Sequence, residues 1–224
     1  MITYFNLRAP DSEGLIADDE SYGNSESRPC PITSQHIDGS RRIGPISVRV
    51  KHNYRDEQMI WCWAFGTLLH ERLLADLEQL GFTGYRTQPA TVCFRDGSVA
   101  TDYREFIVTG WAGIARPESG VTVQKSCSAC QWKHYSAITS YEKLIDWTQW
   151  SGEDFFMVWP IPHKVLITER VAQWFLGHDI KSFRLTGLDD WDHPAGSNGF
   201  TVGRLSDYLP EDLAIKYGKP LGLE

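Results

Sequence analysis

The sequence predicts an α+β fold, with two similar strand–helix–strand halves around a mixed or antiparallel sheet. Three observations predict it. Apolar residues alternate in several short segments, and two other segments carry one apolar face at helical spacing. Residues 56–86 also match residues 154–184 without a gap. At 224 residues the chain can bury a large core, so we expect a single domain over residues 1–224 that needs no disulfide or metal to fold.

Apolar periodicity gives the elements of the first part of the chain. Leu73, Leu74 and Leu77 fall on one helical face, and Gly81 is a typical residue just after a helix end. The long polar segment before residue 46 shows no periodicity and predicts loops. The expected elements are a strand over 2–7, loops over 10–45, a strand over 46–50, a helix over 70–80, one or two strands over 82–94 and a strand over 106–111.

The second part shows the same alternation of strand and helix patterns. Residues 155–159 are almost all apolar, which is typical of a buried strand. Thr168 stands where a helix N-cap is expected, and His70 is its counterpart in the first part. The expected elements are a short helix over 140–147, strands over 155–159 and 165–167, a helix over 168–177, a strand over 180–188 and one or two helical turns within 205–214.

The match between 56–86 and 154–184 predicts an internal repeat. Seven of the 31 aligned positions are identical, and they include the uncommon residues Met59 and Trp61. Average residue usage would give about two identities in such a window. The alternative explanation is a chance match between two amphipathic helices.

Charge and composition limit the classes of ligand. The net charge of −7 argues against a nucleic-acid binder and permits a basic protein partner. No apolar run is long enough for a membrane span, and the first residues lack the pattern of a secretory signal. Five cysteines without a disulfide-type spacing favour a reducing, cytoplasmic location.

The candidate metal ligands are cysteines. Cys127 and Cys130 form a CxxC knuckle, in which two thiolates of one turn can bind the same zinc ion. Cys30 is the best third ligand, and the possible fourth ligands include His36 and His134. One structural zinc is one interpretation of these cysteines. Two others stay open: free thiols in a relic knuckle without any cofactor, and a redox or disulfide role.

An acidic loop is the second candidate site. Asp189, Asp190, Trp191, Asp192 and His193 follow one another directly. Carboxylates and a histidine so close together could hold a divalent cation in a metal-dependent hydrolase. The alternatives are a solvated loop and a partner-binding patch formed by Asp189, Asp190, Trp191 and Asp192, in which the Trp is the anchor for a basic partner.

Seven segments, in a fixed order, resemble one protein family. They are residues 30–33, 68–72, 81–85, 127–130, 154–156, 166–170 and 180–183. Their order resembles that of the double-CXXCG-motif immunity proteins of polymorphic and contact-dependent toxin systems, which pair two knuckles with two copies of a strand, Ser-Glu-Arg, helix and Gly-Phe unit. The resemblance covers roughly 1–188. Thr33 stands in place of a knuckle cysteine, and Gln131 in place of the glycine after the second knuckle.

The resemblance implies a cytosolic immunity protein that binds a cognate toxin and neutralises it. Such a protein has no catalytic residues and is not an enzyme. No local signature of a serine hydrolase, P-loop, HExxH metalloprotease or dinucleotide-binding enzyme is present in the sequence. The remaining alternatives are the metal-dependent hydrolase and, disfavoured by the acidic charge, a zinc-ribbon nucleic-acid binder.

Overall fold

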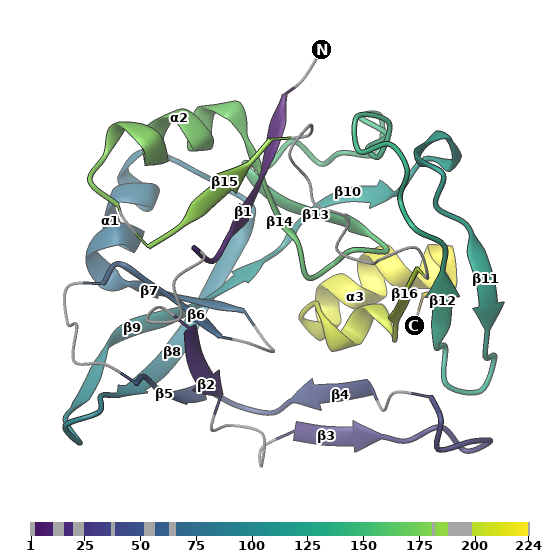
Figure 1. Cartoon of the computed structure of the whole chain (residues 1–224), viewed down its shortest axis with the longest axis horizontal. Helices are drawn as coiled ribbons and strands as arrows, with labels where there is room; N and C mark the ends of the chain where they lie inside the picture. The colour runs from purple at the N-terminus through teal and green to yellow at the C-terminus, as the bar shows by residue number, and fades with distance from the viewer. Residues whose placement is uncertain are drawn as a thin grey trace.

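The computed structural model describes residues 3–10, 16–19, 25–36, 39–51, 57–62, 66–180, 182–187 and 199–223 (Figure 1). Short helices accompany strands in mixed or antiparallel sheets, so the α+β class is confirmed. The largest elements are a closed barrel and an open five-stranded sheet, which share one hydrophobic core.

The closed barrel has the strand order β2-β5-β8-β9-β7-β6. The β5–β8 and β2–β6 contacts are parallel and the other four are antiparallel. Its interior is a separate apolar cluster, to which alternate residues such as Ile46, Val48 and Val92 contribute. The strands are β2 (Ile16–Asp19), β5 (Ile46–Arg49), β6 (Met59–Cys62), β7 (Thr67–His70), β8 (Tyr85–Cys93) and β9 (Val99–Val108).

The five-stranded sheet has the order β10-β13-β14-β1-β15. Only the β10–β13 contact is parallel. All five residues of β13 are buried, as the apolar run predicts. The strands are β1 (Tyr4–Arg8), β10 (Gly110–Ile114), β13 (Phe155–Trp159), β14 (Val165–Thr168) and β15 (Arg184–Thr186).

Two smaller sheets lie to one side of the barrel (Figure 1). One is the antiparallel hairpin of β3 (Ser25–Arg28) and β4 (Gly39–Arg42). The other consists of β11 (Val123–Ser126), β12 (Lys133–Tyr135) and β16 (Phe200–Val202), in which β11 and β12 form a hairpin. The tips of these two hairpins carry the cysteines that the sequence singles out.

The helices are short and amphipathic. They are α1 (Glu71–Gln79), α2 (Glu169–Gly177) and α3 (Glu211–Gly218), with 3-10 turns η3 (Pro117–Ser119), η5 (Leu205–Asp207) and η6 (Lys219–Leu221). Leu73, Leu74 and Leu77 of α1 are buried, which confirms the predicted face. Within the described ranges, no helix is both long enough and apolar enough to cross a bilayer.

The predicted repeat has a counterpart in local structure. β7 and α1 have the same bounds as β14 and α2 when 98 is added to their residue numbers. Each helix follows an antiparallel strand pair, β6–β7 or β13–β14. However, β7 belongs to the barrel and β14 to the open sheet, and the pairing register of the two strand pairs differs by two residues. The described residues therefore show two similar units, and they do not show two symmetric halves.

A buried carboxylate joins the two units. Asp154 Oδ2 accepts hydrogen bonds from the backbone N–H of Thr83 (3.0 Å) and from Arg170 Nη2 (2.7 Å). Thr168 Oγ1 donates to Asp154 Oδ1 at 3.1 Å. The Thr168 hydroxyl therefore bonds to Asp154 and makes no cap bond to α2. In α1, His70 is the functioning cap, because its Nδ1 accepts the backbone N–H of Arg72.

Three expected elements differ from the structure in whole or in part. Residues 140–147 form turns, in which Asp146 accepts hydrogen bonds from Thr148 and Gln149 that compete with a helix. The strand expected over 106–111 is interrupted at Thr109, where the chain passes from β9 in the barrel to β10 in the open sheet. The segment 10–45 contains β2, β3 and β4, and the described side chains of β3 are exposed or half-buried, so they leave no apolar alternation.

Candidate metal centre

Two hairpin tips bring four ligand-type side chains together. The tip between β3 and β4 carries Cys30 and His36, and the tip between β11 and β12 carries Cys127 and Cys130. One sulfur or nitrogen atom from each residue lies within 4.8 Å of all the others. The sequence separation between the tips is about 100 residues, so the cluster is a property of the fold.

The distances fit a tetrahedral ion. Cys30 Sγ and Cys127 Sγ are 3.9 Å apart, and Cys130 Sγ is 3.4 Å from His36 Nδ1. Zinc binds sulfur at about 2.3 Å and histidine nitrogen at about 2.0–2.1 Å, so two ligands of a tetrahedral site lie about 3.5–3.8 Å apart. The four side chains can therefore hold one metal ion with small adjustments.

The second tip has the hydrogen bonds of a tight turn. The backbone N–H of Cys127 donates to the carbonyl of Trp132 at 2.8 Å, and the N–H of Gln131 donates back to the carbonyl of Cys127 at 2.9 Å. Gln131 has φ of 62°, and it is the only non-glycine among the described residues with a positive φ. Glycine is the favoured residue in this left-handed region. Gln131 therefore occupies a backbone position that glycine would adopt without strain.

The first tip has a different construction. The N–H of Ile32 lies 3.5 Å from Cys30 Sγ. Thr33, which stands where a second knuckle cysteine would be, accepts the N–H of Gln35 through its hydroxyl at 3.1 Å. Thr33 therefore stabilises the turn, and His36 supplies the second ligand-type side chain of this tip.

An aromatic stack holds the His36 imidazole. The ring of Trp132 lies parallel to it, with centroids 4.4 Å apart and an interplanar angle of 7°. His134 stacks on the same indole at 6.3 Å. Trp132 thus lies beside both candidate histidines, and it orients His36 so that Nδ1 faces Cys130.

The three thiols differ in acidity. Burial opposes ionisation of Cys30, but hydrogen bonds from the N–H groups of Ile32 and Thr33 outweigh it, so the pKa of Cys30 lies below its ordinary value. A backbone hydrogen bond from Cys130 is the largest factor that lowers the pKa of Cys127. Burial raises the pKa of Cys130 to about 11. A bound divalent cation would favour the thiolate form of all three.

The structure brings together Cys30, Cys127 and Cys130, the three predicted ligands. Of the two open candidates for the fourth position, His36 joins the cluster and His134 does not. The sequence reasoning missed Trp132, although an aromatic residue two positions after a knuckle cysteine is a visible signal. The acidic loop of Asp189, Asp190, Trp191, Asp192 and His193 lies outside the described residues.

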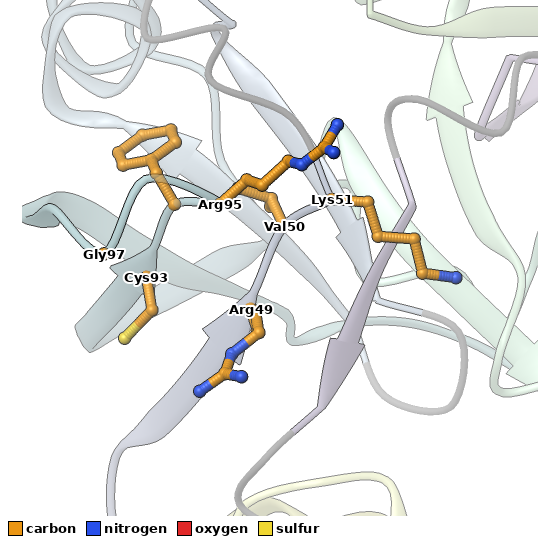
Figure 2. A pocket seen from close by; sticks show the side chains of 7 residues that line it. Arg49, Val50, Lys51, Cys93, Arg95 and Gly97 are labelled. Atoms are coloured by element: carbon orange, nitrogen blue, oxygen red, sulfur yellow. The ribbon is translucent and has the colours of Figure 1, made fainter.

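A second candidate site is a cleft of about 650 Å³ on the barrel. The end of β5 and the β8–β9 turn line it, and its charged residues are Arg49, Lys51 and Arg95. Figure 2 shows that these three side chains extend in different directions and do not converge on one point. Cys93 also lines the cleft, on elements separate from those that carry the metal cluster. The cleft therefore carries the positive charge that an anion site needs, but its charged side chains do not converge on one point.

No protein-family model matches the chain, and no significant match exists among curated proteins.

Proposed function

We propose that this chain is a non-catalytic immunity-type protein whose two hairpin tips are joined by one structural zinc ion. The observation that carries the zinc assignment is the cluster of Cys30, His36, Cys127 and Cys130. The partner is a cognate secreted toxin protein, and the protein acts in the cytoplasm, where thiolates stay reduced.

The donor set favours zinc over other metals. Three thiolates and one imidazole form the Cys₃His set typical of structural zinc sites, whereas calcium and magnesium take oxygen ligands. Four protein ligands leave no open coordination position for water or substrate. Saturated coordination supports a structural role for the ion and gives no support to hydrolysis at this centre.

The position of the cluster supports the same role. The β3–β4 hairpin makes its strand pairs only within itself among the described strands, and it projects from the barrel toward β11 and β12 (Figure 1). An isolated two-stranded hairpin is marginally stable in water. Arg28 of this hairpin donates to Ser206 Oγ at 3.2 Å, and a metal that bridges Cys30 and Cys127 would add a further link between the hairpin and the rest of the fold.

Metal analysis of the purified protein tests the zinc assignment. We expect one zinc per chain, and cobalt substitution should give the absorption of a tetrahedral thiolate complex. Cys30→Ser and His36→Ala should each lower zinc affinity strongly. Cys93→Ser is the matched control, because Cys93 is a half-buried thiol outside the cluster, and it should keep the metal. A purified wild type without zinc that binds no cobalt would contradict the assignment.

The immunity assignment rests on the resemblance of the ordered segments. Two further features support it. The segments that resemble the two knuckles of the immunity proteins, around Cys30 and Cys127, supply the two halves of one cluster. The net charge of −7 suits a basic toxin, since complementary charge speeds association.

A protection assay in a bacterial host tests the immunity assignment. The reading frame beside this gene is induced alone and then together with this chain, and survival is counted. We expect survival to be restored and the two proteins to co-purify in a fixed ratio. A neighbour that is harmless, or that kills regardless of this chain, would overturn the assignment. In that case, hydrolase activity with added divalent metal would be measured for wild type and Asp190→Asn.

A further inference from the structure

Thiols from both hairpin tips lie close enough to react with each other. Two contacts in the cluster are Cys30 with Cys127 and Cys130 with His36, and all four ligand atoms lie within 4.8 Å of one another. The first pair is 3.9 Å apart between sulfur atoms, whereas a disulfide needs about 2.05 Å. The tips must approach by less than 2 Å, which turns outside regular strands can accommodate.

We propose that Cys30 and Cys127 form a disulfide when the metal-free protein meets a peroxide, so that an oxidative link replaces the metal link between the same two tips. This inference rests on the same cluster as the proposed function, but it needs only the positions of the sulfur atoms.

The chemistry balances with hydrogen peroxide as the oxidant. The thiolate of one cysteine attacks a peroxide oxygen and becomes a sulfenic acid, and the leaving hydroxide takes a proton to form the first water. The second thiolate then attacks the sulfenic sulfur, an S–S bond forms, and the departing hydroxide is protonated to a second water. Two thiols and one peroxide thus give one disulfide and two waters.

Cys130 is the competing thiol, either with Cys127 inside one turn or with Cys30 across the tips. Two contacts disfavour these pairs. The turn is closed by the hydrogen bonds between Cys127 and the Trp132–Gln131 segment, and Cys130 Sγ faces the imidazole of His36. Cys30 has no such alternative partner among the cysteines of its own hairpin, because the described hairpin contains no other cysteine. The pairing across the tips therefore uses the two thiols that face each other.

The consequence is mechanical. Either a zinc ion or this disulfide joins the β3–β4 hairpin to the β11–β12 hairpin, so loss of the metal under oxidising conditions does not release the tips. A disulfide between Cys127 and Cys130 would have the opposite effect, because it closes one turn and leaves Cys30 separate.

Peptide mapping of the full-length chain tests the pairing. The protein is stripped of metal with a chelator, treated with hydrogen peroxide, alkylated under denaturing conditions and digested with trypsin. Cys30 falls in the peptide 9–41, and Cys127 and Cys130 share the peptide 126–133. We expect these two peptides to be joined. Fragmentation of the joined wild-type peptides identifies whether Cys127 or Cys130 pairs with Cys30, and we expect Cys127. Cys130→Ser, in which only Cys127 remains in the second peptide, should keep the joined mass.

Matched variants decide the outcome. Cys30→Ser should abolish the joined species, and Cys93→Ser should leave it unchanged. A disulfide inside peptide 126–133 in the wild type, or no joined species in Cys130→Ser, overturns the inference. The zinc content of untreated protein is measured separately: a joined species in a protein that never binds zinc overturns the metal proposal alone, and a zinc protein without the joined species overturns only the disulfide.

Discussion

The imidazole of His36 and the indole of Trp132 are stacked at 4.4 Å, almost parallel, at the edge of the thiol cluster. Outer residues that orient a metal ligand commonly change metal affinity by about 10–100-fold when they are replaced. The stack therefore gives Trp132 a defined role, although it offers no ligand atom of its own.

We expect Trp132→Leu to lower zinc affinity by about tenfold, because the His36 ring loses its orientation while all four ligands stay. Competition against a chromophoric chelator measures the change. His134→Leu is the control, since His134 stacks on the same indole but is not part of the cluster. Equal losses in both variants would contradict this role for Trp132.

The backbone at Gln131 predicts a stabilising substitution. Its φ of 62° lies in the left-handed region, which costs a side-chain-bearing residue about 1–2 kcal/mol. Glycine removes that cost but gains freedom in the unfolded chain, so Gln131→Gly should raise the free energy of unfolding by about 0.5–1 kcal/mol. Urea titration of the metal-free protein measures it. Ala129→Gly in the same turn, at an ordinary φ, should instead lower stability, and a loss in both variants would refute the explanation.

Asp154 predicts a large loss. Its carboxylate is mostly buried and accepts hydrogen bonds from Thr83, Thr168 and Arg170. Asp154→Ala leaves those donors without their acceptor and should cost about 2–4 kcal/mol. Chemical denaturation gives the value. Asp212→Ala is the matched control, because Asp212 forms an exposed ion pair with Arg86, and it should change stability little. Comparable losses would show that burial does not distinguish the two carboxylates.

Asp207 predicts a pH dependence. Burial raises the pKa of this carboxyl, whose Oδ2 accepts the N–H of Arg204. Because the folded state holds the Asp207 proton more tightly than the unfolded state, this group contributes to the free energy of unfolding below the unfolded pKa of about 3.9. That contribution is lost as the pH rises through the folded pKa. The stability of wild type relative to Asp207→Asn should therefore fall as pH increases over this window, in urea titrations at several pH values.

Asp146 supplies the opposite slope as a control. Hydrogen bonds from Gln149 and Thr148 lower its pKa. Its contribution is therefore present above the unfolded pKa and is lost as pH falls through the folded value. The stability of wild type relative to Asp146→Asn should fall toward acid. Slopes of the same sign for the two aspartates would contradict one of the two assignments, and the sign would show which.

The sequence predicts elements best where one face is buried. Helix α1, strand β13 and the pair β14–α2 have strong apolar patterns, and their bounds agree with the expectations within one or two residues. Apolar patterns do not predict a segment whose conformation is decided by side-chain hydrogen bonds or by tertiary contacts. Asp146 binds its own turn, and Thr168 bonds to Asp154 in place of the helix end. The sequence also does not predict the barrel. Its parallel β5–β8 and β2–β6 contacts join segments whose sequences share no pattern that would indicate the pairing.

The metal cluster is partly predictable from residue type. Cys30, Cys127 and Cys130 follow from the knuckle and from the scarcity of other cysteines, and the structure places all three together. The fourth residue cannot be derived from spacing, since His36 and His134 are both close in sequence to a knuckle. Tertiary structure decides between them, because the fold brings a ring nitrogen of His36 within 4.8 Å of the three thiols and leaves His134 outside the cluster.

The strand β1 has a consequence for synthesis on the ribosome. Tyr4–Arg8 is an inner strand of the open sheet, between β14 and β15, and its partners are Val165–Thr168 and Arg184–Thr186. β1 is therefore translated before both partners: about 160 further residues complete β14, and about 180 complete β15. At about 5–20 residues per second, this interval lasts on the order of ten seconds or more. The barrel strands emerge well before, so the open sheet is the last large element that can close around the nascent chain.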